Sequence, residues 1–331
     1  MSARKDIVEL LDRVDANTWD AEVLASCGNP TQLAAFGGLG GRLRRPVYAR
    51  VWRNGVLMLQ WLFYVVGPCR GAAYLDIRSE PSHAHAQAMQ AVLDAAARRF
   101  SPFRIVFDDM VCNRWHSRDI LRALGFEQIH THGTIMLDLE RGIDSLWADL
   151  HKSRRRDIRR GEREDIVIEE QSDAAGAERA WPLIADTLAR GRGRMPRIEH
   201  VRAHAEALCP SDNARLFFAT REGQDQAVIF DFVTPSMALG WLGGTREHAP
   251  RGTASLLQWR IIERMATVGV KTYDLGAVDT QAALDSKGAR IFDSKRRYGG
   301  QLNHHCGGTC TTGVARTGVY DRLLGLYRRW R

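Results

Sequence analysis

The apolar residues of this chain recur with two different periods. Spacings of three and four positions predict helices, whereas alternation in runs rich in β-branched and aromatic residues predicts strands. We expect helices over residues 5–25, 83–100, 117–123, 150–160, 173–190, 198–208, 252–268 and 320–330. We expect strands over residues 47–52, 56–64, 103–107, 134–138, 215–221, 226–232, 237–242, 272–275 and 301–305. Asn54-Gly55 separates the first two strands and predicts a tight hairpin.

The order of these elements indicates two similar halves. A helix, a hairpin, a helix, a strand, a helix and a strand fill the first half, and a comparable mixture fills the second. A chain of 331 residues is long enough for two domains. We therefore expect an N-terminal domain over residues 1–141 and a C-terminal domain over residues 142–331, each of mixed α/β class.

The composition argues against several classes of protein. With 44% apolar residues, the chain can bury globular cores. Its longest apolar run, residues 56–66, contains Gln60 and is too short to cross a bilayer. The first residues are charged and amphipathic, unlike a secretory signal, and the six cysteines form no CxxC pair. We expect a cytoplasmic protein, a monomer, with reduced thiols and no metal.

The positive charge is concentrated in the second half. The net charge is +8, and residues 1–141 hold 17 basic and 15 acidic side chains, which leaves 30 and 24 for the remainder. Clustered basic residues favour a polyanionic partner such as nucleic acid. A solvated, arginine-rich surface is the alternative that charge alone leaves open.

Two basic clusters stand out. On a helix, Lys152, Arg155, Arg156 and Arg159 share one face, and an anionic partner such as phosphate would relieve their mutual repulsion. Pairing with the nearby acidic residues of the same segment is the alternative. The second cluster, residues 190–197, spaces four arginines with glycines and a Met-Pro pair, which suits either anion binding or a surface loop.

A third cluster, residues 293–300, reads Asp-Ser-Lys-Arg-Arg-Tyr-Gly-Gly. It places Lys295 in what we expect to be a basic loop, where an ammonium group can stabilise negative charge on a small electrophile. Asp108 and Asp109 end a strand, where they could act as a base or cap the next turn. Trp241 and Tyr273 fit either a core or a ligand-stacking role.

Residues from about 121 to 303 resemble the Fem-type aminoacyltransferases, a branch of the GNAT-fold superfamily. The resemblance lies in WADLHKSRRRDIRRGEREDI (147–166), ALGWLGGT (238–245), GTASLLQW (252–259), KTYDLG (271–276) and the Lys295 cluster. It implies two tandem GNAT-like domains, each a mixed, mostly antiparallel sheet flanked by helices. It also implies transfer of an amino acid from its charged tRNA to an amine of a peptide-bearing acceptor, which could be a peptidoglycan precursor or a peptide or peptidyl-nucleoside natural product.

The same resemblance implies roles for individual residues. Lys295 would stabilise the tetrahedral oxyanion, and Arg190, at a helix end, would bind the anionic part of the acceptor near Trp241 and Tyr273. The phosphates of tRNA would be held by Lys152, Arg155, Arg156, Arg159, Arg296 and Arg297. Asp108 and Asp109 are the candidates for the base. Aminoacyl-tRNA is the co-substrate, and no cofactor is implied. The family usually has an aromatic residue directly before the lysine, whereas this chain has Ser294.

Two other functions remain open at this stage. An acyl-CoA-dependent N-acyltransferase on the same fold would cradle pyrophosphate with an R-x-x-G-x-G/A turn at a helix N-terminus. The corresponding Arg251-Gly-Thr-Ala254 is too compressed to match that turn. A non-catalytic nucleic-acid-binding protein would explain the basic clusters, but not the glycines around Lys295.

Overall fold

The computed structural model describes residues 6–26, 28–40, 44–67, 74–77, 86–108, 118–191 and 196–311. The chain forms two compact units. The first comprises Met1–His132 and His304–Arg331, and the second comprises Gly133–Asn303. The sequence-based division keeps everything after residue 141 in one domain, whereas these units assign the described residues from His304 onward to the first. The expected helix over 320–330 lies outside the described residues.

The first unit is built on one mixed sheet. Its elements are β1 (Ile7–Leu11), α1 (Ala16–Ser26), η1 (Pro30–Gln32), α2 (Ala34–Gly37), η2 (Gly38–Gly40), β2 (Arg44–Arg53), β3 (Val56–Val66), β4 (Tyr74–Ile77), α3 (Ala86–Phe100), β5 (Arg104–Asp108) and α4 (Arg118–Ala123). Strands β6 (Gln128–Asp138) and β12 (Gln301–Thr311) each contribute residues to both units. The strand order in this unit is β1-β2-β3-β4-β5-β12-β6, in which β4 and β5 are parallel.

The hairpin is confirmed, whereas the helical prediction over residues 5–25 is confirmed only from Ala16 onward. Asn54 and Gly55 have φ of 52° and 77°, the left-handed conformations that a tight hairpin turn needs. Residues 7–11, expected to be helical, form edge strand β1, with Ile7 opposite Trp52 of β2. The cross-strand pairing overrides the weak helical periodicity of these five residues. Helix α1 begins only after Asp15, whose carboxylate accepts the Thr18 N–H at 2.9 Å.

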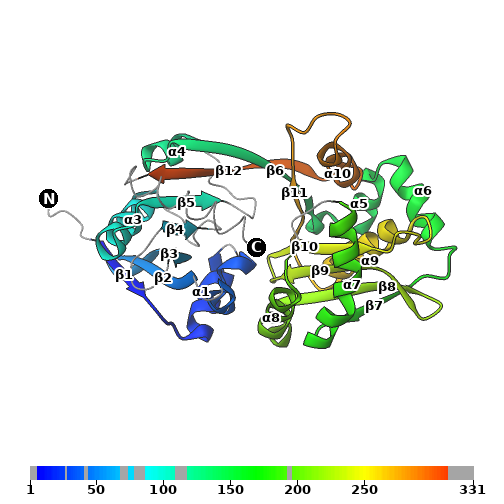
Figure 1. Cartoon of the computed structure of the whole chain (residues 1–331), viewed down its shortest axis with the longest axis horizontal. Helices are drawn as coiled ribbons and strands as arrows, with labels where there is room; N and C mark the ends of the chain where they lie inside the picture. Colours follow the sequence, from blue (N-terminus) through cyan, green and yellow to red (C-terminus); the bar gives the residue numbers. More distant parts are fainter. Residues whose placement is uncertain are drawn as a thin grey trace. The chain divides into compact units, whose positions relative to one another are not determined.

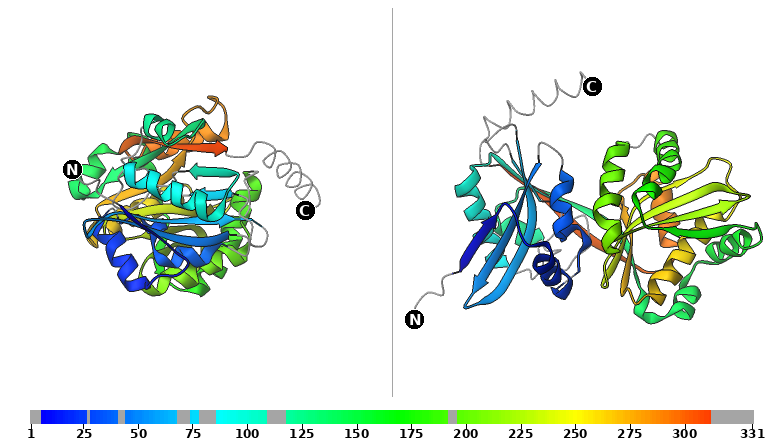
Figure 2. Two further views of the ribbon diagram at one scale, coloured as in Figure 1. Left: turned by 90° about the vertical axis from the view of Figure 1, so that its left-hand side faces the viewer. Right: turned by 90° about the horizontal axis from the view of Figure 1, so that it is seen from below.

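Helices cover both faces of this sheet. Because side chains alternate along a strand, Trp61 and Phe63 of β3 face α3, which packs against β1, β2 and β3 (Figures 1 and 2). On the opposite face, Tyr48 of β2 donates a hydrogen bond to the Ala34 carbonyl at the start of α2. The fully buried Trp19 of α1 lies against Tyr48, with ring centroids 5.0 Å apart.

The second unit repeats the plan with a different connectivity. Its elements are η3 (Leu139–Arg141), α5 (Ile143–Asp149), α6 (Lys152–Gly161), β7 (Val167–Gln171), α7 (Ala174–Arg190), α8 (Ile198–Leu208), η4 (Cys209–Ser211), β8 (Ala214–Arg221), β9 (Gln224–Val233), β10 (Met237–Thr245), α9 (Thr253–Thr267), β11 (Thr272–Val278) and α10 (Lys287–Arg296). The strand order is β6-β11-β10-β9-β8-β7, and β10 and β11 are parallel.

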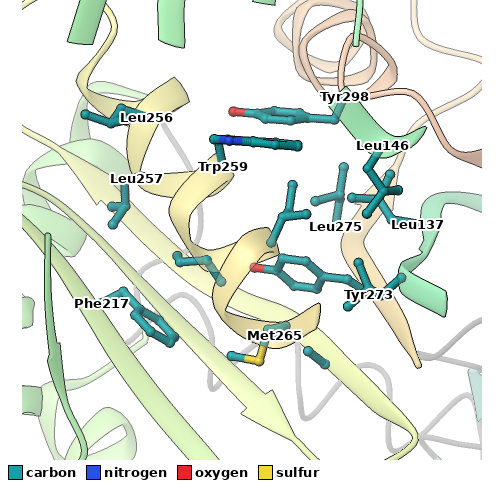
Figure 3. Close-up of a cluster of buried hydrophobic side chains, with 14 of the residues drawn as sticks. Leu137, Leu146, Phe217, Leu256, Leu257, Trp259, Met265, Tyr273, Leu275 and Tyr298 are labelled. Atoms are coloured by element: carbon teal, nitrogen blue, oxygen red, sulfur yellow. The ribbon is translucent and has the colours of Figure 1, made fainter. Parts of the chain in front are cut away.

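The core of this unit lies between α9 and one face of the sheet. Trp259 and Met265 of α9 pack with Tyr273 and Leu275 of β11 (Figure 3). Helices α7 and α8 cover the other face. The close approach of α7 depends on Gly244 of β10, because a Cβ there would overlap the α7 backbone. The predicted α/β class, with mixed sheets flanked by helices, is therefore confirmed.

The segment around Lys295 is a helix, not the expected loop. Ser286 caps α10 by accepting the Ala289 N–H at 3.2 Å. None of the ten residues of α10 is fully buried, so the sequence lacks the apolar stripe that identifies most surface helices. Lys295 occupies the last turn of this helix.

Candidate active site

Strands β10 and β11 become irregular at the same level of the second unit. Their parallel pairing ends at Leu239↔Asp274. Just beyond it, β10 shifts its register against β9 after Gly240, and β11 shifts against β6 between Asp274 and Ala277. Gly276, inside the second irregularity, has φ +83°, a conformation that favours glycine. Such bulges change the direction in which strand side chains point, and they are frequent beside active sites.

A buried carboxylate holds the β11 bulge in shape. Asp274 is 1% exposed, and its Oδ1 accepts the Gly276 N–H at 2.6 Å. The same oxygen accepts a hydrogen bond from the Thr134 hydroxyl of β6. The bulge is therefore fixed by side-chain contacts as well as by strand pairing.

Lys295 reaches this bulge from α10. Its Nζ donates to the Ala277 carbonyl at 3.0 Å, and a Cβ on Gly276 would lie only 3.2 Å from that nitrogen. Partial burial lowers the pKa of Lys295 to about 8, while the negative charge of Asp274 acts in the opposite direction. The ammonium group is therefore still mainly protonated at neutral pH, although it is partly removed from water.

Arg154 is a residue of this region that sequence reasoning missed. It is 8% exposed and donates to the Ser255 hydroxyl of α9 at 2.6 Å. It also donates to the Ser294 carbonyl at 2.7 Å and hydroxyl at 2.9 Å, directly before Lys295. Its guanidinium carbon lies 4.2 Å from the ring centre of Tyr298. Arg154 thus ties α6 to α9 and α10. The one sign of this contact in the sequence is Ser294, which stands directly before Lys295 where the Fem-type family usually has an aromatic residue.

Helix α6 covers the N-terminus of α9. Gly252, the residue before α9, has φ +98°, and a Cβ there would overlap the Asp157 carbonyl and approach the Gly161 N of α6. Thr253 and Ser255, in the first turn of α9, are 1% and 6% exposed. The helix end at which a pyrophosphate would be expected in a CoA-binding protein is therefore partly covered by the backbone of α6.

The basic residues of α6 and α10 differ in what they contact. Lys152 and Arg156 are exposed, whereas Arg155 donates to the carbonyls of Trp147, Ala148 and Leu150 and so caps α5. Arg159 is exposed, with its guanidinium carbon 5.7 Å from the ring centre of Trp147.

The two arginines at the end of α10 share an acidic partner. Arg296 lies 3.2 Å from Asp293, and Arg297 pairs with the same carboxylate. Arg297 also lies 3.5 Å from the Ser153 hydroxyl at the start of α6. The two arginines line a surface hollow of about 320 Å³ together with Asp149, His151 and Asp293. The structure thus brings part of the predicted tRNA-binding set to one place.

The residues predicted to bind the acceptor are not gathered there. Arg190 ends α7, pairs with Asp186 at 3.0 Å and donates to the Thr245 carbonyl of β10. Trp241 of β10 is partly buried and stacks on His204, with ring centres 4.3 Å apart. Burial lowers the pKa of His204 to about 4. Helix α10, which carries Lys295, contacts the end of α7 through Lys287, whose Nζ donates to the carbonyl of Gly191 at 3.0 Å.

Tyr273 is part of the core. It has no exposed surface, donates to Asp231 at 2.7 Å and accepts from Gln258 at 2.8 Å. An acceptor contact at Tyr273 would require this core to open, and it stays a prediction. Asp108 ends β5 in the first unit, beside two histidines, and Asp109 lies outside the described residues. No helix in the described part of the chain is long and apolar enough to span a membrane.

Comparison with known proteins places this arrangement in a known fold. Residues 148–283 match the acetyltransferase (GNAT) domain family. The structure is similar to the crystal structure of FemX, with a TM-score of 0.77 and 16% identity over 95% of this chain and 99% of that one. It is also similar to L-PGS from Bacillus licheniformis, with a TM-score of 0.57 and 13% identity over 96% and 97% of the two chains.

A tandem GNAT protein from the clavulanic acid biosynthesis pathway has a TM-score of 0.54 and 12% identity, over 93% of this chain and 99% of that one. Among curated proteins, none matches this sequence significantly. The similarity at these identities establishes the fold. In fold, the chain is similar to FemX and to this tandem GNAT protein.

Proposed function

We propose that this protein transfers an amino acid from its charged tRNA to an amine of a peptide-bearing acceptor. The observation that carries the proposal is the position of Lys295, whose ammonium group lies against the β11 bulge in a partly buried setting. The fold shared with FemX and the basic residues of α6 and α10 support it.

The reaction needs a donor for developing negative charge. The acceptor amine attacks the ester carbonyl, a C–N bond forms, and the carbonyl oxygen becomes a tetrahedral oxyanion. When the intermediate collapses, the C–O bond to the tRNA ribose breaks, a base takes a proton from the amine, and the ribose oxygen takes up a proton to leave as a hydroxyl group. In this proposal Lys295 donates to the oxyanion. Loss of one such donor typically costs about 100- to 1,000-fold in rate.

The surrounding residues divide between the two substrates in this proposal. Lys152, Arg156, Arg159, Arg296 and Arg297 contact tRNA phosphates, and Arg155 orients α5 and α6 from beneath them. Arg190 and Trp241 contact the acceptor, and Asp108 is a candidate for the base. The protein acts in the cytoplasm as a monomer.

The test supplies purified protein with a mixture of charged tRNAs carrying radiolabelled amino acids and a panel of amines, including muropeptide precursors and small peptides. Label should move to one class of acceptor, and RNase should abolish the transfer. Lys295→Met should reduce the rate by roughly 100-fold or more, while Lys271→Met, which removes an exposed lysine near β11, should not. Transfer at an unchanged rate by Lys295→Met would remove the lysine from the mechanism.

An acyl-CoA-dependent N-acyltransferase is the second candidate, because residues 148–283 match the GNAT acetyltransferase domain. The covered N-terminus of α9 argues against it. Thermal stabilisation by CoA, together with acylation of the same amines by acyl-CoA and none by charged tRNA, would favour this second function over the first.

A further inference from the structure

Three ionisable side chains meet on one face of the sheet in the first unit. Strand β12 lies between β5 and β6, and the three are neighbours in Figure 1. Asp108, the last residue of β5, is directly opposite Gly307 of β12. His130 and His132 are two positions apart on β6, so both point to the same side of the sheet. Neither histidine was selected from the sequence.

The distances among these groups do not fit direct hydrogen bonds. Asp108 Oδ1 lies 3.5 Å from His130 Nε2 and 3.6 Å from His132 Nε2. A charge-assisted N–H···O bond is normally about 2.7–2.9 Å long. Ligands at about 2.0–2.1 Å from a tetrahedral zinc ion lie roughly 3.4 Å from each other. The ligand atoms of all three residues lie within 4.8 Å of one another, close enough for small side-chain rotations to bring them to one ion.

The middle strand leaves room for this cluster. A Cβ at Gly307 would overlap His130 Nε2, so only glycine at this position allows the imidazole to lie over β12. His132 packs against the ring of His130, with centroids 4.7 Å apart, and against the ring of His305, with centroids 5.4 Å apart. Because His305 is 3% exposed, it restricts the rotation of His132 from the buried side.

We propose that Asp108, His130 and His132 bind one divalent transition-metal ion, with Zn²⁺ as the best fit. Two imidazoles and one carboxylate suit zinc or iron, whereas Mg²⁺ and Ca²⁺ prefer oxygen ligands alone. The side chains of Asp108, His130 and His132 are 34%, 46% and 42% exposed, which leaves the fourth position open to water or to an anionic oxygen of a ligand. Such open sites are typical of catalytic zinc, where the pKa of bound water falls to about 7.

This proposal reverses the sequence-based expectation that the protein has no metal. The sequence offers only His-Thr-His at strand spacing, and the carboxylate lies 22 residues earlier at the end of another strand. All three ligands belong to the first unit, and none of them is Lys295, so metal binding can be measured separately from the transfer reaction. Asp108 cannot serve as the free base considered above while it holds the ion.

The test uses the full-length protein, stripped with a chelator and dialysed. Zn²⁺ is titrated against a chromophoric competitor, and bound metal is measured by mass spectrometry. One ion per chain should bind, and Asp108→Ala, His130→Ala and His132→Ala should each weaken binding by roughly tenfold or more. His248→Ala removes an exposed histidine of the second unit and should bind as the wild type does.

Two further measurements distinguish this site from adventitious binding. Gly307→Ala removes no ligand, yet it should weaken Zn²⁺ binding because the new methyl group displaces His130. Bound Co²⁺ should show the visible absorption of a four-coordinate N/O site without a thiolate charge-transfer band. The proposal is overturned if the three ligand variants, folded by circular dichroism, bind Zn²⁺ as tightly as the wild type, or if no ion binds stoichiometrically.

Discussion

Replacing Asp231 with asparagine should stabilise the protein above neutral pH and have much less effect near pH 4. Asp231 has no exposed surface, and burial raises its pKa to about 7, against a usual value of 3.8. The hydrogen bond from the Tyr273 hydroxyl, at 2.7 Å, only partly opposes that shift. Keeping the carboxylate ionised in the folded state therefore costs on the order of 4 kcal/mol, at about 1.4 kcal/mol for each pKa unit.

The direction in which stability changes with pH follows from proton binding by Asp231. Because the pKa of Asp231 is higher in the folded state, the folded protein binds its proton more tightly than the unfolded chain does. This contribution to stability is complete below about pH 4 and is lost as the pH rises through about 7. Asparagine carries no charge at any pH, so its own cost of burial is the same throughout. The difference between variant and wild type should therefore grow by roughly 4 kcal/mol between about pH 4 and pH 8.

Urea unfolding of both proteins, followed by tryptophan fluorescence at several pH values, measures this difference. Asp212→Asn makes the same chemical change at an exposed position and serves as the control. A stability difference for Asp231→Asn that is the same at low and high pH would show that the carboxyl titrates normally in the folded protein. The reasoning from burial would then be refuted.

Three further predictions concern the second unit. The transfer rate of the wild type should decline as the pH rises above about 8, because Lys295 then loses its proton. Lys295→Arg should retain transfer at that pH, and the transfer rates of the two proteins measured as a function of pH test this. Arg154→Met should lower the free energy of unfolding by about 2 kcal/mol, measured in urea, because Ser255 and Ser294 lose a buried partner. Gly244→Ala should lower it by about 1–3 kcal/mol, since its methyl group overlaps the α7 backbone; thermal unfolding measures the loss.

Much of the fold follows from local patterns. Helices α7, α8 and α9 have apolar positions at helical spacing, and strands β8 to β11 are short apolar runs, so the sequence identified them, although it missed β7. The misplaced segments lack that signal. Strand β1 contains no fully buried residue and is defined by its pairing with β2. Helix α10 has no fully buried residue, and its cap at Ser286 is the main local sign of a helix.

The candidate site was less predictable because burial of a charged group is a tertiary property. Charge spacing on α6 singled out Lys152, Arg155, Arg156 and Arg159. The arginine of this helix that is buried is instead Arg154, which the spacing rule left out because it does not lie on that face. Asp108 could be selected as a strand-end carboxylate. Its histidine neighbours could not, because the strand order β5-β12-β6 joins segments far apart in the chain.

Arg154 holds α6 at a fixed distance from Lys295. Arg154 donates hydrogen bonds to the residue directly before Lys295, so the helix that carries Lys152 and Arg156 cannot slide relative to Lys295 without breaking them. A nucleic acid held by those exposed cations would then present its terminal ester at one set separation from the ammonium group. In the proposed reaction, α6 therefore sets the separation between the bound phosphates and Lys295. A substrate shortened or lengthened by one nucleotide would bind in the same place, but its ester would not reach the ammonium group.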